Sequence, residues 1–208
     1  MKYLWVALMI GMYTLQADVL SFEEGEKAYR LNDYKKAYTV WKQLALVEDE
    51  EAQNALGLMY KMGKGVAVDM KLAFKWLLKA AKHDVAQAQY HVALMYLNAQ
   101  GTHRDTRKAS FWLKMSAEEG YDKAQLKLGD MYSKGEGVLQ SHKKAYYWYE
   151  KSAEQDFVQA QFTLASMYCN GQGISKSIQQ CVYWIKEAEK NGFDSSSLRK
   201  KFQLEQYL

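Results

Sequence analysis

Residues 52–81 read AQNALGLMYKMGKGVAVDMKLAFKWLLKAA, and this pattern returns three more times with a period of 36 residues. Six positions are identical in all four copies, without a gap. In the first copy they are Ala52, Gln53, Met59, Tyr60, Gly65 and Trp76. Self-similarity at a period of this length is the signature of a repeat architecture.

Each copy predicts two antiparallel helices joined by a loop. In the first half, Leu56 and Tyr60 recur at helical spacing on one apolar face, which predicts a first helix. Gly65 belongs to the loop after this helix, since glycine adopts the left-handed conformation that closes a last turn. Asp69 is an N-cap residue type and opens a second helix that carries Trp76. A single pair cannot bury its apolar face, so the pairs must stack.

Small residues are predicted where the two helices of one pair approach closely. Gly57 on the first helix is expected opposite Ala73 on the second, and Ala165 opposite Cys181 in the fourth copy. The recurring Tyr and Trp side chains are expected to fill the space between neighbouring units, where they bury a large area.

The sequence therefore predicts an all-α protein, a right-handed α/α superhelix (solenoid) of antiparallel helix pairs. We place the repeats at residues 52–87, 88–123, 124–159 and 160–195. A divergent N-terminal helix pair precedes them at 18–51, and a C-terminal capping helix follows at 196–208. Terminal units of this kind seal the ends of a stack.

The N-terminal residues have the composition of a targeting segment. Lys2 precedes an uncharged, mostly apolar run from Tyr3 to Leu15. This run of about 13 residues is too short to span a membrane but matches the core of a signal peptide. We predict that residues 1–17 are a signal peptide cleaved after Ala17, and that the protein is exported to the periplasm or secreted, without stable membrane insertion. An uncleaved anchor or a buried helix is the alternative.

Composition and charge exclude several classes of protein. Apolar residues make up 49% and charged residues 25% of the chain, which excludes a disordered protein. The net charge of +4 comes from interspersed positive and negative residues, without the basic stripe of a nucleic-acid-binding surface. No two histidines share a metal-ligand spacing with a Cys or carboxylate partner. We expect no metal, no cofactor and no nucleic acid. The four histidines are His83, His91, His103 and His142.

The repeat pattern resembles the Sel1-like repeat family, which is related to tetratricopeptide repeats. The first copy matches it best, through Leu56-Gly57, Tyr60, Gly63-Lys64-Gly65-Val66, Asp69, Trp76 and Lys79-Ala80-Ala81. The second copy has Ala99 in place of a loop glycine, and the fourth has Gln180-Cys181 in place of Lys-Ala. The resemblance implies a non-catalytic scaffold or adaptor whose partner is another protein or a peptide. The oligomeric state stays open.

Positions that drift between copies are the candidates for function, because the recurring positions are explained by the fold. Stacking creates a concave surface lined mainly by the first helices. Apolar and aromatic side chains there, with a polar rim, would suit a peptide or a partner helix. The alternative is that Leu126 and Phe162 are simply core. The candidate binding residues are Asn54, Leu58, Lys61, Tyr90, Leu94, Leu97, Leu126, Asp130, Ser133, Phe162 and Ser166.

Both cysteines fall in the fourth unit. Cys169 lies near the end of its first helix and Cys181 near the start of its second, so antiparallel helices would bring them together. A disulfide and a pair of buried thiols both remain open. A bridge closing a loop of this length would contribute roughly 3 kcal/mol by the chain-entropy estimate.

One alternative function belongs to another class. Ser141 and Lys144 form a Ser-x-x-Lys string, as do Ser197 and Lys200. Some cysteine-rich members of the family are discussed as penicillin-binding or beta-lactamase-like, which implies a beta-lactam or cell-wall hydrolase. The accompanying Ser-Asp-Asn and Lys-Thr-Gly motifs are absent from the sequence. We therefore expect a protein that is not an enzyme.

Overall fold

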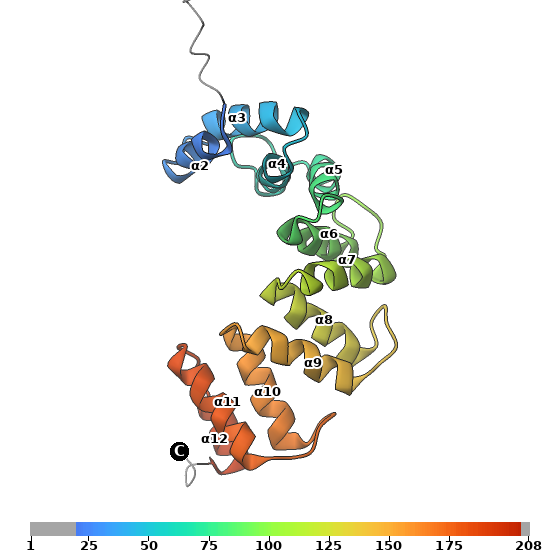
Figure 1. The fold of residues 1–208 in the computed structure, drawn as a ribbon, viewed down its shortest axis with the longest axis vertical. Coiled ribbons are helices and arrows are strands. Elements are labelled where there is room, and N and C mark those ends of the chain that lie inside the picture. The colour runs from blue at the N-terminus through green and yellow to red at the C-terminus, as the bar shows by residue number, and fades with distance from the viewer. Residues whose placement is uncertain (1–19, 205–208) are drawn as a thin grey trace, which may run out of the picture.

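The computed structural model describes residues 20–204, which form eleven α-helices and no strand. The helices follow one another in a curved row from α2 to α12 (Figure 1). The predicted all-α solenoid of helix pairs is confirmed. The predicted signal peptide lies outside the described residues. The helices are α2 (Phe22–Arg30), α3 (Tyr34–Leu46), α4 (Glu50–Met62), α5 (Met70–Ala81), α6 (Ala86–Asn98), α7 (Thr106–Glu118), α8 (Asp122–Lys134), α9 (His142–Ala153), α10 (Val158–Asn170), α11 (Ile178–Lys190) and α12 (Ser196–Phe202).

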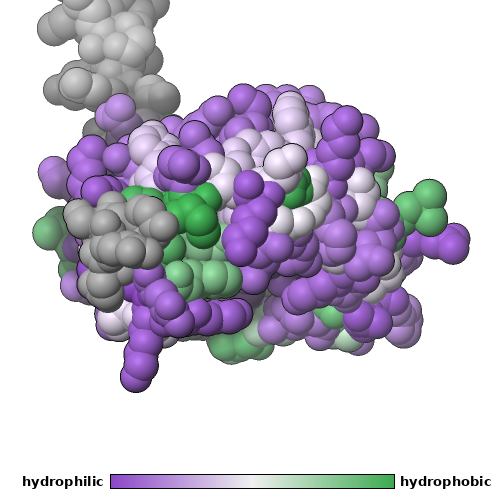
Figure 2. Space-filling model, turned by 90° about the horizontal axis from the view of Figure 1, so that it is seen from below, coloured by the Kyte–Doolittle hydropathy of each residue, from purple (hydrophilic) through white to green (hydrophobic). Residues whose placement is uncertain are grey.

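Each helix packs against the helices before and after it in the chain, from α2 to α11. The core runs through the stack as rows of recurring side chains. The alanine of the first helix is fully buried in all four copies, and the methionine is at most 5% exposed. Viewed from the C-terminal end, the surface is mostly hydrophilic, with one main hydrophobic patch (Figure 2). The recurring apolar positions therefore build the core, as predicted.

The recurring glutamine links each first helix to the unit before it. Gln89 is fully buried, and its Nε2 donates to the carbonyl oxygen of Ala81 at 3.2 Å, at the end of α5. The last carbonyls of a helix lack partners within that helix. The side chain therefore satisfies an otherwise unpaired acceptor and fixes where the next pair begins. The same bond joins Gln53 to Ala45, Gln125 to Ala117 and Gln161 to Ala153, although these three carbonyls also accept a backbone N–H.

The recurring loop glycine makes a second contact between units. Gly101 has φ +67°, and a Cβ on it would lie 1.9 Å from the carbonyl oxygen of Met70, at the start of α5. Gly65 and Gly137 meet the first residues of α3 and α7 in the same way. Ala99 replaces only the other loop glycine, and it takes the left-handed conformation there, with φ 53°. The position that touches the preceding unit thus accepts nothing but glycine.

The second helices begin at the predicted N-caps. Asp69 accepts a hydrogen bond from the backbone N–H of Leu72 at 2.9 Å, and Ser141 accepts one from Lys144 at 3.3 Å. Most of the first helices begin differently. Helices α6, α8 and α10 follow Val85, Tyr121 and Phe157, whose side chains form no capping hydrogen bond. These apolar residues contribute packing between units in place of a cap.

The recurring tyrosines lie between units, as predicted. The hydroxyl groups of Tyr60 on α4 and Tyr38 on α3 are 2.9 Å apart. Burial, followed by this hydrogen bond, raises the pKa of Tyr60 to about 12. The close approach within a pair is also present, but its partner differs from the prediction. A Cβ on Gly57 would meet Leu77, one turn beyond Ala73 on α5, at 2.7 Å.

Further helices occupy both ends of the stack. At the N-terminal end, α2 and α3 enclose Trp41, whose ring stacks on Phe22 with centroids 5.5 Å apart. At the other end, Leu198 of α12 is buried against the fourth unit. Helix α4 begins two residues before the start that we predicted for the first repeat. The exact unit boundaries stay a prediction.

The loop glycine gives a direct test of the packing between units. We expect Gly101→Ala to lower the free energy of unfolding by about 3 kcal/mol or more, because it adds a backbone clash to left-handed strain. Gly120→Ala is the matched control, since Gly120 has φ +88° with no atom within 4 Å of its Cβ position. Strain alone should cost that variant about 1–2 kcal/mol. Urea unfolding measures both, and equal losses would contradict the packing role.

Candidate functional site

The predicted binding residues all lie on the first helices α4, α6, α8 and α10. Ten of the eleven are partly exposed, and Asn54 is buried, with 5% of its surface accessible. Asn54 differs from the others because its Nδ2 donates to Oε1 of Gln87 on α6 at 2.7 Å. We call the surface formed by these residues the first-helix face.

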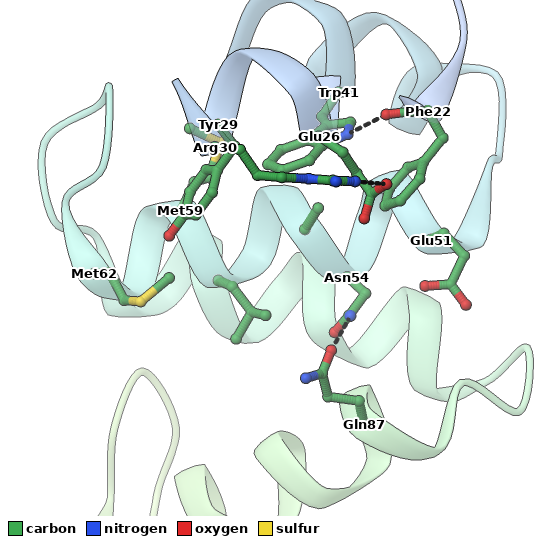
Figure 3. Close-up of a pocket in the computed structure, with 12 residues that line it drawn as sticks. Phe22, Glu26, Tyr29, Arg30, Trp41, Glu51, Asn54, Met59, Met62 and Gln87 are labelled. Carbon is green, nitrogen blue, oxygen red and sulfur yellow. Dashed lines mark hydrogen bonds and ion pairs between the residues drawn. The ribbon is translucent and has the colours of Figure 1, made fainter. Parts of the chain in front are cut away.

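At the N-terminal end this face deepens into a pocket of ≈ 330 Å³ between α2, α4 and α6. Tyr29 and Arg30 of α2 lie on one side, and Asn54 and Gln87 lie on the other (Figure 3). Leu58 also lines the pocket. The structure thus brings two predicted residues, Asn54 and Leu58, into one cavity with residues of α2 that the sequence did not single out.

The middle of the face carries a Lys-His pair between two units. Nζ of Lys61 on α4 lies 3.4 Å from Nδ1 of His91 on α6. Burial lowers the pKa of His91 to about 4, with smaller contributions from Lys61 and Lys123. Burial also lowers the pKa of Lys61. A neutral imidazole can accept a hydrogen bond from the ammonium group at Nδ1, so the pair is compatible near neutral pH.

The equivalent candidate residues Tyr90, Leu126 and Phe162 pack against neighbouring residues as well as facing solvent. The ring of Tyr90 lies 5.3 Å from that of Tyr121, and Phe162 lies 4.5 Å from Phe193. Leu126 packs on a core cluster formed by α9 and α10. The core alternative for these residues is therefore correct in part. The partners were missed, although Val85, Tyr121, Phe157 and Phe193 recur with the same period and are all apolar.

The polar candidate residues Asp130 and Ser166 form hydrogen bonds within their own repeat units. Asp130 accepts a hydrogen bond from the Tyr149 hydroxyl at 2.9 Å, and Oγ of Ser166 accepts one from Asn170 at 3.2 Å. Burial, followed by the charge of Asp130, raises the pKa of Tyr149. Partly exposed apolar side chains such as Leu94 and Leu97 are therefore the stronger contact candidates.

A row of exposed aromatic residues on the second helices was also missed. Phe111, Tyr147 and Tyr183 on α7, α9 and α11 are 56%, 49% and 51% exposed. They recur every 36 residues, so the repeat itself contains the signal. Each ring lies 5.0–5.3 Å from the recurring tryptophan that follows it in the chain. Part of each ring thus covers a tryptophan, and the rest faces solvent.

The two cysteines meet between α10 and α11. The sulfur atoms of Cys169 and Cys181 lie at disulfide-bonding distance, with Cα atoms 5.3 Å apart, and both residues are fully buried. The antiparallel arrangement predicted from their positions is therefore correct. This link is particular to the fourth unit, since the corresponding residues of the other units are not cysteines.

The Ser-x-x-Lys string has a structural explanation. Ser141 caps α9, and Nζ of Lys144 lies over the ring of Tyr132, 5.3 Å from its centroid. Ser197 and Lys200 are exposed on α12. Within residues 20–204, no three His, Cys, Asp or Glu side chains gather as a metal site would require.

The comparisons with known proteins identify the family. The Sel1 repeat model matches residues 50–85, 86–121, 122–157 and 158–193. The chain belongs to the Sel1 repeat family. The matched ranges keep our period and begin two residues earlier than our repeats. No functionally curated protein gives a significant match.

Solved Sel1 repeat proteins share this fold. The Sel1 repeat protein from Oxalobacter formigenes is 30% identical with a TM-score of 0.79, over 83% of this chain and 71% of that one. A protective antigen of uropathogenic Escherichia coli strains, which has an SLR fold, is 32% identical to this chain, with a TM-score of 0.79. The match covers 83% of this chain but only 37% of the antigen. A putative Sel1 repeat protein from Klebsiella pneumoniae, 21% identical with a TM-score of 0.56, covers 92% of this chain and 96% of its own length. In the described part of this Sel1 repeat protein, no helix is both long and apolar enough to cross a membrane.

The lowered pKa of His91 predicts acid destabilisation. The folded state favours the neutral ring, so the unfolded chain takes up the proton first as pH falls below about 6.5. The free energy of unfolding should fall by about 2 kcal/mol between pH 8 and pH 5 from this residue, and level off below about pH 4. Urea unfolding across this range measures the slope. His91→Gln should flatten it, and an unchanged slope would contradict the assignment.

Reduction of the Cys169–Cys181 pair should destabilise the fourth unit. We expect dithiothreitol to lower the free energy of unfolding by roughly 3 kcal/mol, because it releases a closed loop in the unfolded chain. The variant with Cys169→Ala and Cys181→Ala should have the same stability with and without reductant. Free thiols in the untreated protein, detected by mass after alkylation, would count against a bridge.

Proposed function

We propose that this Sel1 repeat protein is a non-catalytic adaptor that binds another protein or a peptide on its first-helix face. Sel1 repeats are generally protein-interaction scaffolds. The observation that carries the proposal is the partial exposure of apolar side chains at those positions of the face that differ between the repeat copies. Leu58, Leu94 and Leu97 keep solvent access, whereas the recurring alanine and methionine of the same helices are buried in all four copies.

The fold restricts some positions of each repeat and leaves others free to vary. A repeat position that must be buried recurs, because every unit meets the same neighbours. A position that changes from Leu58 to Asp130 while remaining partly exposed is under no such restriction. A curved face with apolar centres and polar edges suits an extended peptide or an amphipathic helix.

The proposal also places the adaptor in the cell envelope or outside the cell. The closely placed pair Cys169 and Cys181 supports an oxidising compartment, where disulfides persist. The apolar run that we predict to be a signal peptide supports the same compartment. Retention in the cytoplasm of a tagged full chain, shown by fractionation, would count against this placement.

Crosslinking in intact cells tests the binding face. A photoreactive amino acid at Leu58 or Leu97 should capture one dominant protein, because both positions lie in the proposed contact surface. The same amino acid at Leu139, which is 90% exposed on a loop, is the matched control and should not capture it. Capture should fall at least tenfold when Tyr90→Ala is combined with Leu94→Asp.

Folding of that double variant is checked by its circular dichroism and by its urea midpoint. Phe111→Ala, on a second helix, should leave the capture unchanged. If the adduct forms equally from Leu139, or survives the double variant in a folded protein, the binding site is not the first-helix face.

A further inference from the structure

The pocket at the N-terminal end has an acidic side without a matching cation. Residues 48–51, which lead into α4, are all acidic, and Glu51 lines the pocket. Asp49 is used as the cap of α4, since it accepts a hydrogen bond from the N–H of Ala52 at 2.7 Å. Among residues 20–204, no Lys or Arg forms an ion pair with Glu48, Glu50 or Glu51. Burial, followed by repulsion from Asp49 and Glu50, raises the pKa of Glu51.

A buried acceptor lies one turn further along α4. Only 5% of the Asn54 surface is exposed, and its Nδ2 donates its hydrogen bond to Gln87. Its Oδ1 is buried and receives no hydrogen bond, and Asn54 is one of the residues that line the pocket. Such an acceptor is destabilising until a donor reaches it. Residues three apart on a helix share a face, so Glu51 and Asn54 offer a carboxylate and an amide oxygen side by side.

The cation that the pocket already contains is engaged elsewhere. Arg30 pairs with Glu26 at 3.0 Å, and Figure 3 shows this pair along the α2 side, away from Asn54. The remaining lining includes apolar surface from Leu58 and Met62. The pocket therefore combines an apolar wall long enough for a chain of methylene groups with unpaired negative and acceptor groups at one end.

This combination occurs only at the first unit. The positions of Glu51 and Asn54 become Gln87 and Tyr90 in the second copy, Lys123 and Leu126 in the third, and Gln159 and Phe162 in the fourth. The fold does not require a carboxylate or an amide there. Acidic residues in a first helical turn do interact favourably with the helix dipole, but Glu50 can serve that purpose without facing the pocket.

We propose that this pocket binds a lysine or arginine side chain of the partner. The methylene groups pack on Leu58 and Met62, and the cationic head donates a hydrogen bond to Oδ1 of Asn54 and pairs with Glu51. This inference rests on the proposed function, because the pocket is the N-terminal part of the first-helix face. It gives the bound segment a direction, with a basic residue at α2 and α4 and apolar residues toward α10.

Methyl NMR of the full chain tests the pocket directly. Labelled methionine provides reporters, because Met59 and Met62 line the cavity. The probes are N-acetyl-lysine methylamide and N-acetyl-arginine methylamide. N-acetyl-norleucine methylamide is the neutral reference of similar length. The basic probes should shift the Met62 signal saturably, with an affinity at least tenfold above that of norleucine.

Matched variants separate recognition from general charge. Glu51→Gln and Asn54→Leu should each weaken binding of the basic probes at least fivefold. Glu50→Gln removes the same charge from the same turn outside the pocket and should change binding less than twofold. Equal binding of norleucine, or equal effects of Glu51→Gln and Glu50→Gln, would overturn the proposal. Glu51→Gln changes an exposed residue, so the result does not depend on how well Asn54→Leu folds.

The outcome is distinguishable from that of the crosslinking experiment. If Leu97 captures a partner but the basic probes do not bind, the first-helix face stands and the basic-residue pocket fails. If the probes bind but capture survives the change at Tyr90 and Leu94, the pocket stands and the wider face fails.

Discussion

The buried hydrogen bond between a first-helix glutamine and the end of the preceding helix is the contact on which the stack depends. It appears at Gln53, Gln89, Gln125 and Gln161. Apolar packing alone favours burial without fixing direction, whereas an amide aimed at one carbonyl sets the position of each new pair. The loop glycine, typified by Gly101 against Met70, adds a second contact that no larger residue can make. Together they explain why two polar or small positions recur as strictly as the aromatic ones.

Units that are alike in their core differ at their surfaces and at their ends. The first unit joins α2 in a pocket with an acidic side, the second brings Lys61 and His91 together, and the fourth carries the cysteine pair. None of these features removes the recurring glutamine bond between units. A solenoid allows this separation, because each unit touches only its neighbours and the rest of its surface is free to vary. Function in such a protein is therefore expected where the copies disagree.

Comparison of the four repeat copies predicts some residues of the first-helix face correctly and misses others. Comparing copies located the drifting positions on the first helices, and ten of those residues are partly exposed. It did not predict that Asn54 would be buried, because that depends on a hydrogen bond to Gln87 in the next unit. It also overlooked the aromatic row at Phe111, Tyr147 and Tyr183. These residues recur, and recurrence was interpreted as a sign of burial, although more than half of the Phe111 surface is exposed.

The sequence by itself determined the helix pairs, their order, the N-caps of the second helices and the family, because these follow from local spacing repeated four times. Residues such as Asp69 and Gly63 act within a few positions of the chain, so their effects can be inferred without knowing the fold. Only the tertiary structure decided the partner of Gly57, the pairing of Tyr90 with Tyr121, and the pocket between α2, α4 and α6. Those depend on how far one helix is shifted along another, and that shift is set by side-chain packing across units rather than by spacing along the chain.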